Sequence, residues 1–223
     1  MKIDVLDYGF VRLVDSMGSD LSVVRAARVS YDADWRAGED QGSDARLINY
    51  LWKNRHTSPF EAVTFTFEVK APIFVFRQWH RHRTWSFNEV SARYTELPEE
   101  VYIPSTDVIT TQSTANKQQR TNEMHPSAPH FRNIMIEHAK ASYGRYKLML
   151  ENGCPRELAR CVLPVATYSR MFATVNLLNL LKFLSLRDHD HAQHEVRVYA
   201  QAMATLIEDI VPVTLKAFKE SQS

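Results

Sequence analysis

The residues best suited to chemistry lie in one stretch, 81–94, which carries three arginines, one histidine and one glutamate interleaved with aromatic residues. It follows a strongly apolar run, 71–76. Charged side chains are costly to bury without partners, so a polar cluster at the end of a core element is a common place for a binding site. The sequence therefore predicts a ligand-binding site within 81–94.

The residue types in this stretch suit a planar anion such as a nucleotide. The rigid fork of an arginine grips a phosphate or a carbonyl edge with two hydrogen bonds. Asn88 and Ser91 can add neutral hydrogen bonds, and Glu89 can accept one from an imide N–H or a ribose hydroxyl. Three aromatic side chains could stack on flat rings: Trp85, Phe87 and Tyr94. Chemistry alone leaves a solvated basic loop without function as an equal alternative.

The spacing of these residues is more specific than their chemistry. Arg81-His82-Arg83, followed after seven residues by Ser91, resembles the signature of the flavin-dependent thymidylate synthases. The flanks 77–79 and 88–94 also match, and the resemblance extends over most of the chain. It implies conversion of dUMP to dTMP, with methylenetetrahydrofolate as carbon donor and FAD, reduced by NADPH, as hydride carrier. It also implies a homotetramer whose active sites are built between chains.

The resemblance assigns site residues as well. For dUMP they are Gln78, Arg81, Glu89, Ser91, Ala92, Arg93, Arg160 and Arg187. For FAD they are Ser30, His56, Ser58, Arg81, His82, Arg83, Glu89, Asn176 and Lys182. Arg81 and Arg187 match the arginines that contact uracil, and we expect them to be catalytic by stabilising charge that develops on the ring carbonyls. We interpret Ser91 as a phosphate donor, because no base is identifiable that would make it a nucleophile.

Two positions depart from the family pattern. Leu178 stands where many members place an arginine that helps to hold the flavin. Lys182 stands where other members place asparagine or histidine. We therefore expect a different grip on the flavin, in which Lys182 replaces part of the lost positive charge.

Composition narrows the function further. The chain has 223 residues, of which 27 are basic and 26 acidic, so its net charge is 27 − 26 = +1. This balance does not favour wholesale binding to nucleic acid or membranes, and no apolar run is long enough to span a bilayer. The two cysteines lie seven residues apart, on or near one helix, where geometry disfavours a disulfide between them. With no recognisable signal peptide, these features predict a cytoplasmic protein.

The hydrophobic pattern predicts one α+β domain over 1–223, an antiparallel sheet flanked by several helices. Strands are expected at 3–5, 11–13 and 63–69, the last alternating apolar and polar residues with one buried face. Helices are expected over 20–27, 47–52, 72–81, 131–149, 155–160 and 176–187. A further helix is expected after Asp190 and ends at 207, and a short terminal helix begins at 212.

Local signals accompany these elements. Ser19 or Asp20 is expected to cap the first helix, Ser58 and Glu61 to form a capping box, and Asp190 to cap the helix that ends at 207. Turns or loops are expected at 15–18, 32–43 and 106–127. The segment 106–127 is rich in Thr, Gln and Asn, and we expect a mobile surface loop, a solvated insertion rather than a lid over the site.

Two other functions stay open. The arginine- and aromatic-rich stretch could be the stacking platform of a nucleic-acid-binding protein, although the balanced charge argues against it. His189, His191 and His194 could form the metal site of a hydrolase, because imidazoles at this spacing can converge. The resemblance accounts for these histidines without a metal, so no metal site is predicted.

Overall fold

The computed structural model describes residues 1–222; Ser223, the last residue of the predicted domain, lies outside the described part. At its centre is a five-stranded antiparallel sheet in the order β1–β2–β3–β7–β4. The strands are β1 (Lys2–Val5), β2 (Gly9–Met17), β3 (Thr64–Pro72), β4 (Ser86–Glu89) and β7 (Tyr168–Asn176).

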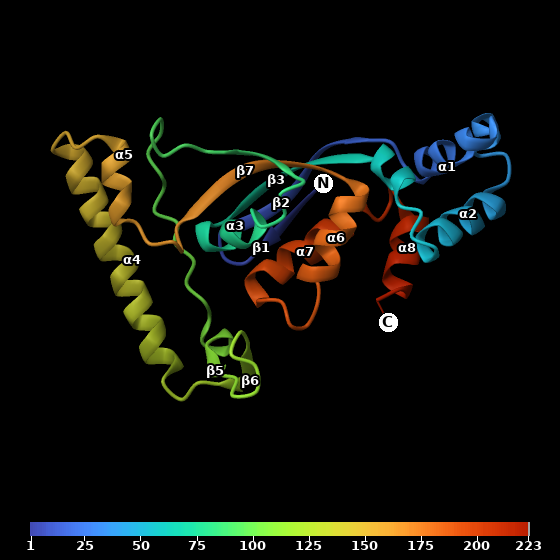
Figure 1. Cartoon of the computed structure of the whole chain (residues 1–223). Helices are drawn as coiled ribbons and strands as arrows, with labels where there is room; N and C mark the ends of the chain where they lie inside the picture. The colour runs from blue at the N-terminus through green and yellow to red at the C-terminus, as the bar shows by residue number, and fades with distance from the viewer. Residues whose placement is uncertain (223) are drawn as a thin grey trace.

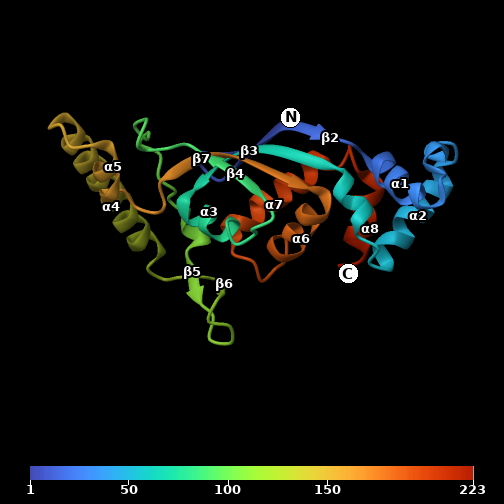
Figure 2. The ribbon, with the colours of Figure 1, turned by 45° about the horizontal axis from the view of Figure 1, so that its top comes forward.

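The helices surround this sheet on one face and at both ends. They are α1 (Asp20–Arg28), α2 (Gln41–Lys53), α3 (Ile73–Trp79), α4 (Ala128–Glu151), α5 (Arg156–Ala159), α6 (Leu177–Arg187), α7 (His194–Ile207) and α8 (Pro212–Glu220). α3, α6 and α7 lie under the sheet, α1, α2 and α8 gather at one end, and α4 and α5 stand at the other (Figures 1 and 2). The arrangement confirms the predicted α+β fold.

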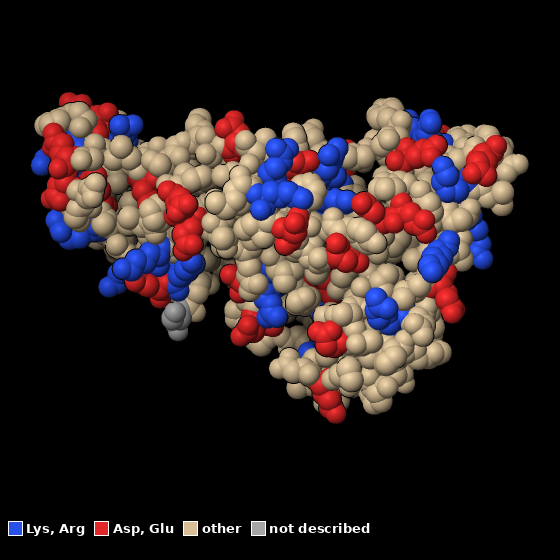
Figure 3. Space-filling view, turned by 180° about the vertical axis from the view of Figure 1, so that it is seen from behind, with Lys and Arg blue, Asp and Glu red and all other residues tan. Residues whose placement is uncertain are grey.

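β3 is the central strand, and its apolar residues follow the predicted alternation, with Phe65 and Phe67 fully buried. Glu68, one of the alternating polar residues, is also buried, with only 6% of its surface exposed. The Glu68 carboxylate accepts from Nε of Arg12 in β2 at 2.7 Å and pairs with Arg170 of β7 at 3.2 Å. Ion pairs therefore join neighbouring strands, and basic and acidic side chains are intermixed over the back of the molecule (Figure 3).

Aromatic side chains fill the core between the sheet and its helices. Trp79 of α3 stacks on Phe183 of α6, with ring centroids 4.8 Å apart, and meets Tyr199 of α7 edge-on at 6.2 Å. The Tyr199 hydroxyl donates to the carbonyl of Lys70 in β3 at 2.8 Å. A Cβ at Gly9 would collide with this hydroxyl, so β2 must begin with a glycine. These contacts fix α3, α6 and α7 against the sheet.

The first helix is capped as expected, by Ser19. Its hydroxyl accepts from the backbone N–H of Leu21 at 3.3 Å. Asp20, the alternative cap, instead accepts from the backbone N–H of Val213 at 2.7 Å and from Thr214. Asp20 therefore ties α1 to the start of α8.

Two other predicted caps are wrong. Ser58 and Glu61 do not form a capping box, because 58–62 is a single 3-10 turn without a side-chain cap and β3 begins two residues later. Asp190 does not cap α7, since the helix begins only at His194. The Asp190 carboxylate pairs instead with Arg197 at 3.3 Å.

Two predicted irregular segments are partly regular. The expected turn at 15–18 is mostly strand, because β2 runs to Met17 and 15–17 pair with 64–66 of β3. The expected loop 32–43 ends early, because α2 begins at Gln41 with the Asp40 side chain accepting from the backbone N–H of Ser43.

The segment 106–127, which was predicted to be a mobile surface loop, contains a β-hairpin. β5 (Thr110–Gln112) and β6 (Arg120–Met124) pair in antiparallel fashion. The hydroxyls of Thr111 and Thr121 meet across the strands at 2.6 Å. β-branched threonines fit a pleated surface, so they favour strands over disorder.

α4 is confirmed as a long helix, but its apolar side chains stay uncovered in the single chain. Phe131, Ile134, Met135 and Leu148 are exposed, Leu148 to 59%. A groove of about 290 Å³, lined by Met135 and by other apolar side chains from Phe74 and 101–104, runs beside the helix. No helix in the described part of the chain is both long and apolar enough to cross a membrane.

We expect the two ion pairs of Glu68 to be non-additive. Arg12→Met or Arg170→Met alone leaves Glu68 one arginine, so each should lower the free energy of unfolding by about 1 kcal/mol, as for a half-exposed pair. Both changes together leave a buried carboxylate without a cation, which should cost roughly 3–5 kcal/mol. Urea unfolding of the four proteins measures the coupling. A double variant that is no worse than the sum of the single variants would contradict this.

Candidate active site

The end of α3 and the start of β4 position the signature residues. α3 ends at Trp79, so Arg81 does not share the helix with Gln78 as the sequence predicted. Residues 80–85 form a turn, and β4, which was not among the predicted strands, then pairs with β7. Trp79 and Trp85, both buried, anchor the two ends of this turn.

Arg187, the last residue of α6, reaches this turn. Its Nε donates to Nε2 of His82 at 3.0 Å, and a terminal N–H donates to the backbone carbonyl of Gln78 at 3.2 Å. The His82 ring lies edge-on to Phe183 of α6, with centroids 4.9 Å apart. The side-chain amide of Gln78 donates to the amide oxygen of Gln193 at 2.5 Å. The structure thus joins three predicted site residues from α3, the turn and α6.

Burial sets the protonation of this cluster. Burial, and then the positive charge of Arg187, lowers the pKa of His82 from 6.5 to about 4. His82 is therefore neutral near pH 7, and because its Nε2 accepts from Arg187, its proton lies on Nδ1. Burial also lowers the pKa of Arg187, but a guanidinium stays charged. The charged guanidinium of Arg187 is therefore held in a partly desolvated position beside the neutral imidazole of His82, whose Nδ1–H can donate a hydrogen bond.

Ser91, Arg93 and Arg160 form a second group beside α5. The Ser91 hydroxyl oxygen accepts from the backbone N–H of Arg93 at 3.3 Å. Nε of Arg93 pairs with the Glu157 carboxylate at 3.5 Å, and Arg160 donates to the Glu157 carbonyl at 3.3 Å. Ala92 is buried between its neighbours. Two guanidinium groups therefore gather around one acidic residue.

The two groups do not meet within the described part of one chain, where no hydrogen bond or ion pair joins them. Arg187 ends α6 under the sheet, whereas Arg93 and Arg160 lie with α5 at the far end (Figures 1 and 2). The predicted dUMP residues are therefore divided between two places.

The remaining predicted flavin residues follow α6 toward its start. Asn176 caps α6, because its Oδ1 accepts from the backbone N–H of Asn179 at 2.9 Å. His56 and Ser58 are exposed before β3, and the turn that begins at Ser58 packs against α6. Ser30 is exposed just after α1, which packs on the same turn. α1, the turn 58–62 and α6 therefore pack in succession.

The structure accounts for the departure at Leu178. This side chain is 4% exposed and belongs to the main hydrophobic core, so it occupies space that a charged residue could not fill cheaply. Lys182, one helical turn later, is exposed. α6 therefore carries an exposed cation one helical turn beyond the buried Leu178.

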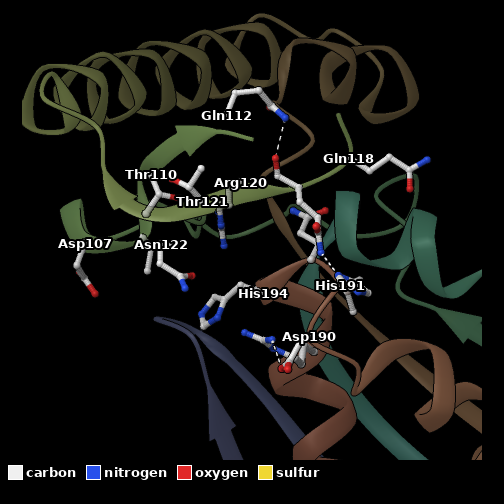
Figure 4. A pocket seen from close by; sticks show the side chains of 15 residues that line it. Asp107, Thr110, Gln112, Gln118, Arg120, Thr121, Asn122, Asp190, His191 and His194 are labelled. Atoms are coloured by element: carbon white, nitrogen blue, oxygen red, sulfur yellow. Dashed lines mark hydrogen bonds and ion pairs between the residues drawn. The ribbon is translucent and has the colours of Figure 1, made fainter. Parts of the chain in front are cut away.

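A polar cleft of about 860 Å³ lies between the hairpin and the start of α7. Arg120 and Asn122 of the hairpin point across it toward His194 (Figure 4). Arg120 also pairs with Glu195 at 3.1 Å, a contact between residues 75 positions apart. Sequence reasoning gave the hairpin no role at the site, and no signal in the sequence links these two residues.

The cluster 189–194 shows no metal geometry. The rings of His189 and His191 lie 4.7 Å apart, and Nδ1 of His191 contacts the Gln119 amide at 2.5 Å. Across residues 1–222, no three His, Cys, Asp or Glu side chains are grouped so that they could hold a metal ion. The metal-site hypothesis therefore gains no support.

Comparison with known proteins bears on the identity of the chain. A family described as "Thymidylate synthase complementing protein" matches residues 12–213. The flavin-dependent thymidylate synthases of Thermotoga neapolitana and Ehrlichia ruminantium are each 46% identical, over 98% and 97% of this chain and 94% and 72% of their own lengths. The solved structure of the UMP/dUMP methylase PolB from Streptomyces cacaoi, bound with 5-Br dUMP, is 39% identical with a TM-score of 0.87, covering 98% of this chain and 97% of that one.

The shared fold and these relatives define the chain as an enzyme. It belongs to the flavin-dependent thymidylate synthase family, as the signature at 81–91 implied. Membership favours this class over both alternatives, the nucleic-acid-binding protein and the metal hydrolase.

We expect His82 to titrate near pH 4, well below the ordinary pKa of 6.5. The unfolded chain binds this proton at a higher pH than the folded chain does, so His82 should destabilise the fold progressively as pH falls from 6.5 to about 4. NMR titration of the imidazole Cε1–H signals, assigned with His82→Gln, measures the pKa. Arg187→Met should raise it only part of the way, because burial remains. A wild-type pKa near 6.5 would contradict the expected effect of burial on His82.

Proposed function

We propose that the protein methylates dUMP to dTMP, taking the carbon from methylenetetrahydrofolate and the hydride from FAD that NADPH has reduced. The observation that carries the proposal is Arg187, a half-buried guanidinium held by His82 and Gln78 in a chain of this family. The relative bound with 5-Br dUMP supports dUMP as the nucleotide.

The signature turn offers the donors that a flavin dinucleotide needs. Arg81 and Arg83 are exposed, and no ion pair within residues 1–222 engages either of them. Two such guanidinium groups suit a diphosphate, and the Nδ1–H of neutral His82 can donate to a ring carbonyl. The exposed Lys182 adds a further cation. When bound, the flavin supplies the hydride; these residues bind and orient it.

The other flavin residues rest on the family resemblance. Ser30, His56, Ser58 and Glu89 are exposed, so a ligand can reach them. Asn176 can contribute only its Nδ2, because its Oδ1 is engaged by the helix cap.

Arg187 is suited to activate uracil because its charge is not neutralised. Its two contacts are a neutral imidazole and a backbone carbonyl, and no ion pair in the described part of the chain involves it. A guanidinium has five N–H groups, so others remain for a ring carbonyl. In partly dry surroundings its field on the ring is stronger than in water. Arg81, in the same turn, would provide a second positive charge near the ring.

The group beside α5 is proposed to hold the phosphate. Arg93 and Arg160 would grip it, with Ser91 donating a neutral hydrogen bond and Ala92 and Glu89 completing the nucleotide contacts. Within residues 1–222 no side-chain base is hydrogen-bonded to Ser91, so the hydroxyl is not activated for attack. Cys154 and Cys161 donate only to backbone carbonyls, so neither thiol has an activating partner there.

Assembly into a homotetramer would bring the divided residues together. The exposed apolar side chains of α4 and the apolar groove beside it are surfaces that a second copy of the chain could cover. A site built between chains would place the proposed phosphate-binding residues of one chain, Ser91, Arg93 and Arg160, next to Arg187 of another.

Two arginine variants test the assignment of roles. Truncating a charge-assisted contact costs roughly 2–5 kcal/mol when it is buried, and less at an exposed site such as Arg93. Arg93→Ala should raise the dUMP concentration that gives half-maximal rate and largely spare the rate at saturation. Arg187→Ala should lower that rate even when dUMP saturates. The measurement is single-turnover oxidation of pre-reduced enzyme, followed by flavin absorbance, with dTMP identified by chromatography.

Wild-type protein that binds no flavin, or that forms no dTMP, would refute the proposed function. Equal saturating rates for Arg187→Ala and wild type would refute only the activating role of Arg187.

Mixing two impaired variants, assayed at a dUMP concentration too low to saturate Arg93→Ala, tests whether the site is shared. If Arg187 and Arg93 enter one site from different chains, random reassembly of Arg187→Ala with Arg93→Ala chains should restore about a quarter of the sites. Native mass spectrometry confirms mixing, and each variant reassembled with itself is the control. No rescue in well-mixed assemblies would place both residues in one chain.

A further inference from the structure

Glu195, near the start of α7, is a buried carboxylate outside the predicted site. It is 2% exposed. Oε1 accepts from the Tyr102 hydroxyl and from Arg120, both at 3.1 Å, and Oε2 accepts from the side-chain amide of Gln193 at 2.8 Å. Burial raises the pKa of Glu195, but Arg120 and Gln193 outweigh it and hold the pKa below its ordinary value. Glu195 is therefore ionised at neutral pH.

An ionised carboxylate can only accept hydrogen bonds, and this dictates the direction of the two amides that follow. Gln193 must turn its NH₂ toward Glu195, so its oxygen faces Gln78. Gln78 must then turn its own NH₂ toward Gln193, at 2.5 Å. No hydrogen bond within residues 1–222 reaches Oε1 of Gln78. The side-chain oxygen of Gln78, Oε1, is therefore available to accept a hydrogen bond from a ligand.

We propose that Glu195 is a positioning residue that acts through Gln193, making Gln78 present a hydrogen-bond acceptor to the nucleotide. This inference rests on the proposed function, in which Gln78 binds dUMP. The donor on dUMP is either the imide N–H of uracil or the 3′-hydroxyl of the sugar. The relay thereby contributes to the choice of nucleotide without touching it.

The hairpin takes part in this relay through Arg120. Arg120 begins β6 and reaches Glu195 beside the polar cleft of Figure 4. Without this cation the buried carboxylate would favour its protonated form, which can donate as well as accept. The 106–127 segment is therefore linked to the site by a charge pair.

The experiment compares how tightly holoenzyme binds dUMP and two analogues by calorimetry. dCMP lacks the imide N–H, and 2′,3′-dideoxy-UMP lacks the 3′-hydroxyl. Wild type should bind dUMP more tightly than the analogue that lacks the donor whose hydrogen bond the side-chain oxygen of Gln78 accepts. Glu195→Gln can present either end of an amide, so both downstream amides can turn. The preference should then shrink by about three- to tenfold, the size of one neutral hydrogen bond.

Tyr102→Phe is the matched control. It removes one hydrogen bond from the same carboxylate but keeps its charge and its contact with Gln193, so the preference should stay at the wild-type value. If Glu195→Gln fails to fold, Gln193→Met interrupts the relay at an exposed position and should reduce the preference equally.

Three results would overturn the proposal: an unchanged preference when the relay is broken, an equal loss in Tyr102→Phe, or no preference in wild type for dUMP over either analogue. Wild type that binds dUMP and forms dTMP, yet shows one of these results, would leave the proposed function intact and reject the relay alone.

Discussion

The site depends on β7 being hydrogen-bonded along both edges, to β3 on one side and β4 on the other. α6 follows β7 without a linker and is capped by Asn176, so the register of the sheet sets where the helix begins. The helix is eleven residues long and ends in Arg187. β4 pairs with the same strand and holds the turn that contains His82. The positions of Arg187 and His82 are therefore both set by β7.

Within residues 1–222, the buried carboxylates of Glu68 and Glu195 and the half-buried guanidinium of Arg187 are stabilised in different ways. Glu68 and Glu195 each have arginine partners, so their charges are compensated and serve to fix neighbouring elements. Arg187 is held by uncharged groups, and no carboxylate in the described part of the chain pairs with it. Desolvation is costly for such a cation. In the proposed function, this cost falls at the position where the charge acts on the nucleotide.

The elements with strong periodicity were predictable from sequence, and those that depend on tertiary contacts were not. The alternation of 63–69 and the leucines of 176–187 indicated β3 and α6, since their buried faces follow from local order. β4 is short and mostly polar, and it is a strand because the edge of β7 is available to it. The β5–β6 hairpin was not predicted, because the segment that contains it is rich in Thr, Gln and Asn, a composition typical of surface loops. The contact between Arg187 and His82 spans 105 residues, so only the family resemblance indicated that both belong to the site.

α4 has a consequence for the life of the chain in a cell. In a single chain, α4 stands away from the sheet and exposes apolar surface. This surface consists of Phe131, Ile134, Met135 and Leu148. Exposed apolar patches of this kind are what chaperones and proteases recognise in incompletely assembled proteins. In the proposed homotetramer, the abundance of the protein would depend on how quickly newly made chains assemble, so quality control and assembly would act through the same helix.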